Sequence, residues 1–103
     1  MDKDEIIRKV KQFAVKAASE FQVNKIILFG SFVKGTFSDR SDIDVAVILD
    51  SLDVDLLESE FKLFKMRRDI DYRIEPIIFI GEEDKSGFLE EILKSGTVVY
   101  QAA

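Results

Sequence analysis

The residues best suited to chemistry gather in one segment, GSFVKGTFSDRSDIDVAVI, which runs from Gly30 to Ile48. Gly30 and Ser31 follow an apolar run, where a glycine lets backbone amides approach an oxyanion and a serine hydroxyl adds a donor. Asp42 and Asp44 are two apart on a predicted strand, so their carboxylates share a face, with α-carbons about 6–7 Å apart. Carboxylates this close repel each other, and Mg²⁺, which prefers oxygen ligands, relieves the repulsion. The segment therefore predicts a phosphate cradle near a magnesium site.

A third carboxylate would complete a two-metal arrangement, in which one cation activates the attacking oxygen and the other holds a triphosphate. Glu75 is the candidate, because it lies near the start of a predicted strand and shares a face with Phe79, where a core side chain is expected. Asp71 is the reserve candidate. The alternative for Glu75 is an edge-strand acid paired with Arg73 or Arg68.

Composition excludes several other kinds of chemistry. The 103 residues include no Cys and no His, which rules out disulfides, thiolate metal sites, imidazole bases and Ser-His triads. The net charge of −5 argues against direct binding of nucleic acid through phosphate neutralisation. No apolar stretch approaches the roughly 18–20 residues that span a bilayer. The charged N-terminal segment does not resemble a secretory signal, so we expect a cytoplasmic protein.

The elements that must position these residues follow from periodicity and breakers. Helices are predicted over the first 21 residues, from about Val54 to near Arg67-Arg68, and from about Phe88 to a stop at Gly96. Strands are predicted at 25–29, 42–49, 74–80 and 97–100, and Pro76 favours an edge for the third. We expect one domain over residues 1–103, with an α+β fold in which a four-stranded mixed sheet packs with about three helices.

Aromatic residues divide into two predicted groups. One group falls at core-facing positions of the predicted helices and strands, and comprises Phe13, Phe21, Phe29, Phe61, Phe64 and Phe79. Phe32 and Phe37 lie instead in the polar loop between the first two strands, where either a nucleotide pocket or a partner surface would use them. The loop itself is predicted to hold at most one helical turn.

Gly30-Ser31, ten intervening residues and Asp42-Ile43-Asp44 together match the GS-x10-DxD signature of the polymerase-β-like nucleotidyltransferase superfamily. In its length and in the segment SDIDVAVI (residues 41–48), the chain resembles the minimal nucleotidyltransferases of prokaryotes. The resemblance implies transfer of a nucleoside monophosphate, with AMP from ATP expected, to a hydroxyl group. It implies that Ser31 binds phosphate, that Asp42 and Asp44 hold Mg²⁺, and that Glu75 completes the catalytic and metal-binding set.

The predicted nucleotide-binding residues are Gly30, Ser31, Lys34 and Ser41. The sequence departs from the family pattern at two of the site positions. Glu75 stands where many relatives have Asp, and Lys34 stands where an Arg is common, so a bidentate phosphate contact is replaced by a point charge. The alternatives without a functional role are an ordinary turn at Gly30-Ser31 and, for Asp42 and Asp44, a pair of solvated acids near Arg40.

Minimal members of this family often act with a helical HEPN-domain partner, and some are antitoxins that add AMP to a tyrosine of that partner. Since the sequence leaves no residues for an acceptor-binding domain, the resemblance predicts that another chain or a second copy holds the acceptor. Homo-oligomerisation stays open. The competing hypothesis is a catalytically weak or inactive nucleotide-binding module that neutralises its partner by contact.

Overall fold

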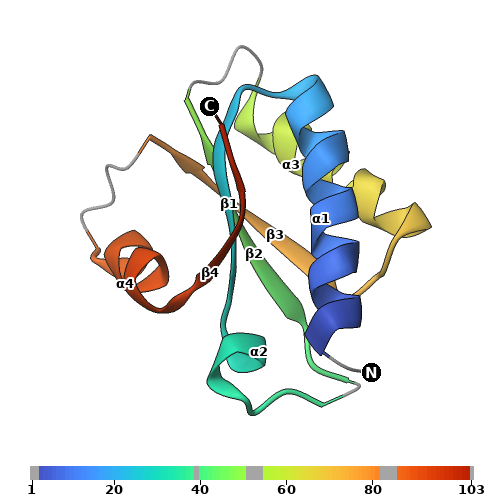
Figure 1. The fold of residues 1–103 in the computed structure, drawn as a ribbon. Coiled ribbons are helices and arrows are strands. Elements are labelled where there is room, and N and C mark those ends of the chain that lie inside the picture. The colour runs from blue at the N-terminus through green and yellow to red at the C-terminus, as the bar shows by residue number, and fades with distance from the viewer. Residues whose placement is uncertain (1–2, 39, 51–54, 82–85, 103) are drawn as a thin grey trace.

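The computed structural model describes residues 3–38, 40–50, 55–81 and 86–102. Figure 1 shows a four-stranded sheet with two long helices on one face and a short one on the other. Along the chain the elements are α1 (Lys3–Glu20), β1 (Val23–Phe29), α2 (Ser31–Lys34), β2 (Ile43–Leu49), α3 (Leu56–Met66), a 3-10 turn (Arg67–Asp69), β3 (Ile74–Ile80), α4 (Phe88–Ser95) and β4 (Thr97–Gln101).

The strand order is β3-β2-β1-β4, so the two site-bearing strands β2 and β3 are neighbours. β1 pairs antiparallel with β2 and with β4, whereas β2 and β3 are parallel and are joined by the crossover through α3. This mixed sheet confirms the predicted fold class. β3 is an edge strand, as Pro76 requires, because the missing amide of proline then costs no ladder hydrogen bond.

The sheet separates two apolar cores. The larger core lies between the sheet and α1 and α3, and it includes Val10, Phe13, Leu28, Val47 and Leu63. The smaller core lies under α4, where Leu89 and Ile92 pack on strand residues of the opposite parity, including Ile27, Ala46 and Ile48. Every second residue of a strand faces the same way. The even-numbered residues of β2 therefore face α4, which places Asp44 on that side of the sheet.

The predicted boundaries hold with small shifts, except for the orientation of the second main helix. α3 turns Ser59, Leu63 and Met66 into the core, whereas Leu57 is 73% and Phe61 64% exposed. The prediction that Phe61 is a core residue is therefore wrong, and Val54 lies outside the described residues. When a helix carries two apolar stripes, the spacing of its residues does not show which stripe is buried. Here the contacts of α3 with α1 and β3 bury the stripe that contains Leu63 and Met66.

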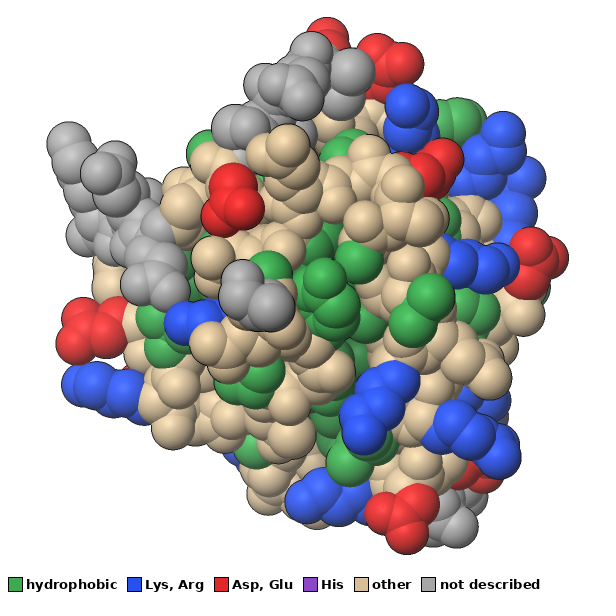
Figure 2. Space-filling model, turned by 45° about the horizontal axis from the view of Figure 1, so that its top comes forward, with side chains coloured by type: hydrophobic (Ala, Val, Ile, Leu, Met, Phe, Trp, Pro, Cys, Tyr) green, Lys and Arg blue, Asp and Glu red, His purple; other side chains and the backbone are tan. Residues whose placement is uncertain are grey.

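The molecule shows no helix, among the residues described, that is long and apolar enough to cross a membrane. On the face drawn in Figure 2, apolar side chains appear in small patches between polar groups, and cationic side chains gather toward one side. Phe32 is buried at 4% exposure and its ring lies 4.6 Å from that of Phe37. Phe32 is thus a core residue that Phe37 covers.

Candidate nucleotidyl-transfer site

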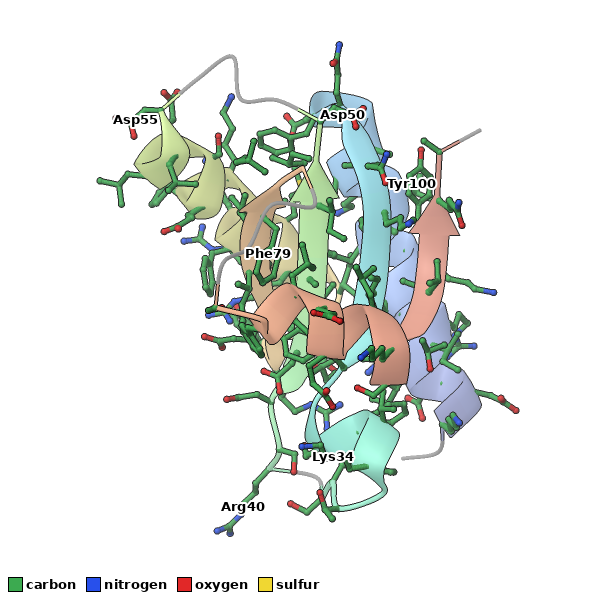
Figure 3. All side chains as sticks on the ribbon, turned by 90° about the vertical axis from the view of Figure 1, so that its left-hand side faces the viewer. Lys34, Arg40, Asp50, Asp55, Phe79 and Tyr100 are labelled. Carbon is green, nitrogen blue, oxygen red and sulfur yellow. The ribbon has the colours of Figure 1, made fainter. Side chains whose placement is uncertain are left out.

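Asp44 and Glu75 lie directly opposite each other on the parallel strands β2 and β3. Neighbouring strands are about 4.8 Å apart, so these half-buried side chains start from adjacent positions on the face that α4 covers. α4 lies across this face, and Lys34 and Arg40 lie beyond it at the end where β1 stops and β2 begins (Figure 3). The acidic pair therefore lies near the start of β2 and β3, at the end of the sheet where β1 stops.

The electrostatic environment of Asp44 links it to both other predicted metal ligands. The pKa of Asp44 is raised above its usual value, first by burial and then by the negative charges of Asp42 and Glu75. A raised pKa means that the folded protein disfavours the charged form of this carboxyl group. A divalent cation bound between these carboxylates would relieve the repulsion that they exert on Asp44.

These residues fit a hard divalent cation in kind, since all three offer carboxylate oxygens. Asp42 is exposed in the residue before β2, and Asp44 and Glu75 are half-buried. Within residues 3–38, 40–50, 55–81 and 86–102, no three carboxylates lie close enough together to form a metal site as they stand. A cation would therefore have to draw the side chains toward itself.

Gly30 brings the end of β1 against the same carboxylate. Its φ of 82° lies in the region that favours glycine, and its carbonyl accepts hydrogen bonds from the amides of Val33 and Lys34, each at 3.1 Å. A β-carbon built at Gly30 would collide with the Asp44 carboxylate. The Gly-Ser turn and the second aspartate of the signature are thus in direct contact across β1 and β2.

The remaining predicted nucleotide-binding residues surround this turn without forming one cluster. Ser31 is half-buried, and its carbonyl closes α2 by accepting from the Thr36 amide at 3.0 Å. Lys34 is exposed in the last turn of α2. Ser41 closes the preceding turn, where its amide donates to the Ser38 carbonyl at 3.0 Å and its hydroxyl accepts from the Ser38 amide at 2.8 Å. The Ser41 hydroxyl is therefore engaged by the loop itself.

Arg67 is a site residue that the sequence indicates only as part of a basic cluster with Arg68 and Arg73, for which a solvated helix end is the favoured interpretation ahead of contacts with a triphosphate or a partner. Its guanidinium donates to the carbonyl of Ile74 at 2.8 Å and lies 3.8 Å from the Glu75 carboxylate. It also lies over the Phe64 ring, 4.7 Å from the centroid. Glu75 therefore has an arginine partner, as the alternative interpretation expected, and that partner is Arg67. The signal in the sequence was weak, because three arginines cluster there and spacing does not rank them.

Asp71, the reserve third carboxylate, is a structural residue. It accepts hydrogen bonds from Lys9 on α1 at 3.0 Å and from the Arg73 guanidinium at 2.7 Å. The hydrogen bonds from Arg73, with help from Lys9, hold the pKa of Asp71 well below its usual range. Asp71 precedes β3 in a turn, so the alternation of the strand does not extend to it, and it faces α1 instead of Glu75.

The fold and this signature match known proteins over nearly the whole chain. The family model "Polymerase beta, Nucleotidyltransferase" matches residues 8–103, and the chain belongs to this family of nucleotide-transferring enzymes. A protein of Methanocaldococcus jannaschii named "Putative protein adenylyltransferase" is 28% identical over 101 residues, which cover 92% of this chain and 99% of that protein. A second protein of that organism, with the same description, is 38% identical over 45 residues, or 42% of this chain and 45% of its own length.

Two solved structures share the fold at low sequence identity. A crystal structure described as a "putative nucleotidyltransferase" from Sulfolobus solfataricus superposes with a TM-score of 0.64 at 18% identity, covering 93% of this chain and 80% of that one. A chain of a toxin-antitoxin crystallised with AMP-PNP superposes with a TM-score of 0.68 at 20% identity, covering 89% and 73%. At these identities the likeness concerns the fold.

Proposed function

We propose that this protein is a Mg²⁺-dependent nucleotidyltransferase that moves AMP from ATP to a hydroxyl of a partner protein. The observation that carries the proposal is the contact of the Gly30 turn with Asp44, itself opposite Glu75. A turn that suits phosphate thereby adjoins carboxylates that suit a cation. The names of the two Methanocaldococcus relatives support a protein as acceptor and adenylate as the transferred group.

In this proposal the acceptor oxygen attacks the α-phosphorus of ATP, the bond to the β-phosphate oxygen breaks, and pyrophosphate leaves. Gly30, Ser31, Lys34 and Ser41 hold the triphosphate, which fixes the α-phosphorus in line with the acceptor. Asp42 and Asp44 hold the cation, and Glu75 takes the acceptor proton. Bound Mg²⁺ supplies Lewis-acid stabilisation of the charge that develops on the phosphate oxygens.

We further propose that the acceptor is a tyrosine of a helical HEPN-type toxin and that this chain is its antitoxin. Two observations support this proposal: the similar fold of the toxin-antitoxin chain crystallised with AMP-PNP, and the resemblance to minimal nucleotidyltransferases. Residues 8–103 match the family model, so this stretch is proposed to work as one minimal domain while another chain presents the acceptor.

The test is label transfer from [α-³²P]ATP to the purified partner in the presence of MgCl₂. Asp44→Asn should abolish transfer, because it removes a ligand charge at the centre of the site. Asp50→Asn is the matched control, since it removes the same charge at the exposed far end of β2 (Figure 3). Labelling that is equal in both variants, or absent from the wild type with every divalent cation, would contradict the proposal.

A second function has support in one observation. The 3.8 Å ion pair of Arg67 with Glu75 partly neutralises the third carboxylate, as would suit a module that binds its partner without chemistry. In that case Asp44→Asn would neutralise the partner as well as the wild type does. Loss of neutralisation together with loss of label would instead assign the effect to the transfer reaction.

A further inference from the structure

The outward stripe of α3 is apolar although it is largely exposed. Leu57 and Phe61 are four residues apart, so they lie on one side of the helix, with exposed fractions of 73% and 64%. Tyr72, in the turn before β3, adds a ring that is 71% exposed. Singly exposed apolar residues are common, but a row of large ones beside a hollow is typical of a binding surface.

The hollow has a volume of about 230 Å³ and lies at the C-terminal end of this stripe. Three aromatic and three cationic side chains line it, namely Phe61, Phe64, Lys65, Arg67, Arg68 and Tyr72. Within the described part of the chain, Lys65 and Arg68 form no ion pair. In a chain with a net charge of −5, such a rim is a local positive site that attracts acidic groups.

Arg67 connects this hollow to the proposed catalytic site. Its guanidinium stacks on Phe64 in the wall of the hollow and lies 3.8 Å from the carboxylate of Glu75. The Arg67 side chain therefore connects a ligand in the hollow to the carboxylate of Glu75. This adjacency is what the acceptor of a transfer reaction needs, because its hydroxyl must reach the site while the rest of it is held nearby.

We propose that the stripe and hollow of α3 bind an acidic polypeptide segment of the acceptor protein, which inserts an aromatic or aliphatic anchor between Phe61 and Tyr72. The cationic rim selects acidic residues around the anchor, and Leu57 extends the apolar contact along the helix beyond the reach of a small ligand. The proposal rests on the proposed function for its link to transfer, but binding itself requires no nucleotide.

The probe is a dye-labelled random copolymer of Glu and Tyr, which carries acidic residues, ring anchors and acceptor hydroxyls together. Binding is measured by fluorescence anisotropy without ATP, and ¹H–¹⁵N NMR shifts locate it on the wild-type protein. Phe61→Ala and Arg68→Glu should each weaken binding by about tenfold, as expected for a buried ring and a charge reversal. A copolymer of Lys and Tyr should bind at least about tenfold less tightly than the acidic one.

Matched controls are available on α1, where Val15 is 68% exposed and Lys11 is also exposed. Val15→Ala removes a smaller exposed apolar side chain and Lys11→Glu reverses a positive charge, both at a separate hollow on α1, and binding should stay within about twofold. NMR shifts confined to residues 56–72 support the proposal. Shifts that centre on α1, or equal affinity for the acidic and basic copolymers, overturn it.

Failure of this inference can be told from failure of the proposed function. Asp44→Asn should bind the acidic copolymer as the wild type does, yet transfer no label from ATP to its tyrosines. Transfer by Asp44→Asn would refute the proposed function and leave the surface standing. Conversely, wild-type affinity in Phe61→Ala and Arg68→Glu would refute the surface, whatever the transfer assay gives.

Discussion

The carboxylate of Asp44 occupies the space into which a side chain at Gly30 would project. A β-carbon at Gly30 would lie 3.2 Å from the Asp44 Cγ and 3.3 Å from its Cβ, with the carboxylate oxygen closer still. Carbon atoms rarely approach so closely, and the Asp44 side chain is held on the strand opposite Glu75. The glycine of the signature is thus required by the aspartate as much as by the turn.

Gly30→Ala should therefore cost more stability than Gly35→Ala, although both glycines have φ near 80°. Gly35 has open space around its missing β-carbon, so Gly35→Ala carries only the backbone penalty of about 1 kcal/mol. Gly30→Ala adds displacement of Asp44, for a total of about 2–3 kcal/mol. Urea unfolding measures both values. Equal costs would show that Asp44 moves aside freely.

Asp44→Asn should stabilise the fold at neutral pH. Because the pKa of Asp44 is raised, the folded chain binds its proton more tightly than the unfolded chain, so stability falls as pH rises from about 3.8 through the raised pKa. After allowance for partial exposure, we expect a melting temperature about 2 °C above the wild type at pH 7. The gain should vanish below about pH 3.8.

Mg²⁺ should raise the thermal stability of the wild type, because a cation that binds the folded site shifts unfolding by mass action. With MgCl₂ and a non-hydrolysable ATP analogue in excess, we expect a rise of about 2–5 °C in melting temperature. Asp42→Asn and Asp44→Asn should lose most of this rise. A rise of the same size in both variants would place the cation elsewhere on the protein.

Asp71→Asn should destabilise the fold by about 2 kcal/mol at pH 7 without changing the chemistry of the site. The cause is loss of charged hydrogen bonds from Lys9 and Arg73, which tie α1 to the turn before β3. Because the pKa of Asp71 is lowered, its contribution is present above about pH 3.8 and is lost as pH falls below it.

The check is the difference in unfolding free energy between Asp71→Asn and the wild type at pH 7 and pH 3. That difference should shrink in acid, whereas a packing effect would keep it constant. Ser19→Ala serves as a control for a local hydrogen bond, since the Ser19 hydroxyl donates only to the Lys16 carbonyl at 2.6 Å on the exposed side of α1.

The sequence predicted most of what depends on local pattern. The strand at Ile74–Ile80 matches to the residue, whereas the strand predicted at 42–49 begins at Ile43, so Asp42 precedes it. The first strand starts at Val23 instead of Lys25, because pairing with Leu49 of β2 extends it. The short α2 agrees with the single helical turn allowed in the loop.

What depends on contacts between distant elements could not be read from the chain. The outward side of α3 follows from its packing on α1 and β3, so Phe61 was misplaced. The ion pairs of Asp71 with Lys9 and of Glu75 with Arg67 join segments whose spacing carries no signal. The contact between Gly30 and Asp44 depends on the register in which β1 pairs with β2. The spacing in the sequence made this contact plausible but did not determine the register.

The sheet keeps two kinds of charge apart. On the α1 side, Asp71 accepts hydrogen bonds from cationic side chains and stabilises the fold. On the α4 side, Asp44 is repelled by other carboxylates and destabilises the fold when it is charged. The two sets face opposite sides of the sheet, so the side chains that hold Asp71 differ from the carboxylates that surround Asp44. Variants on the α1 side, such as Asp71→Asn, therefore change stability without altering the carboxylates that face α4.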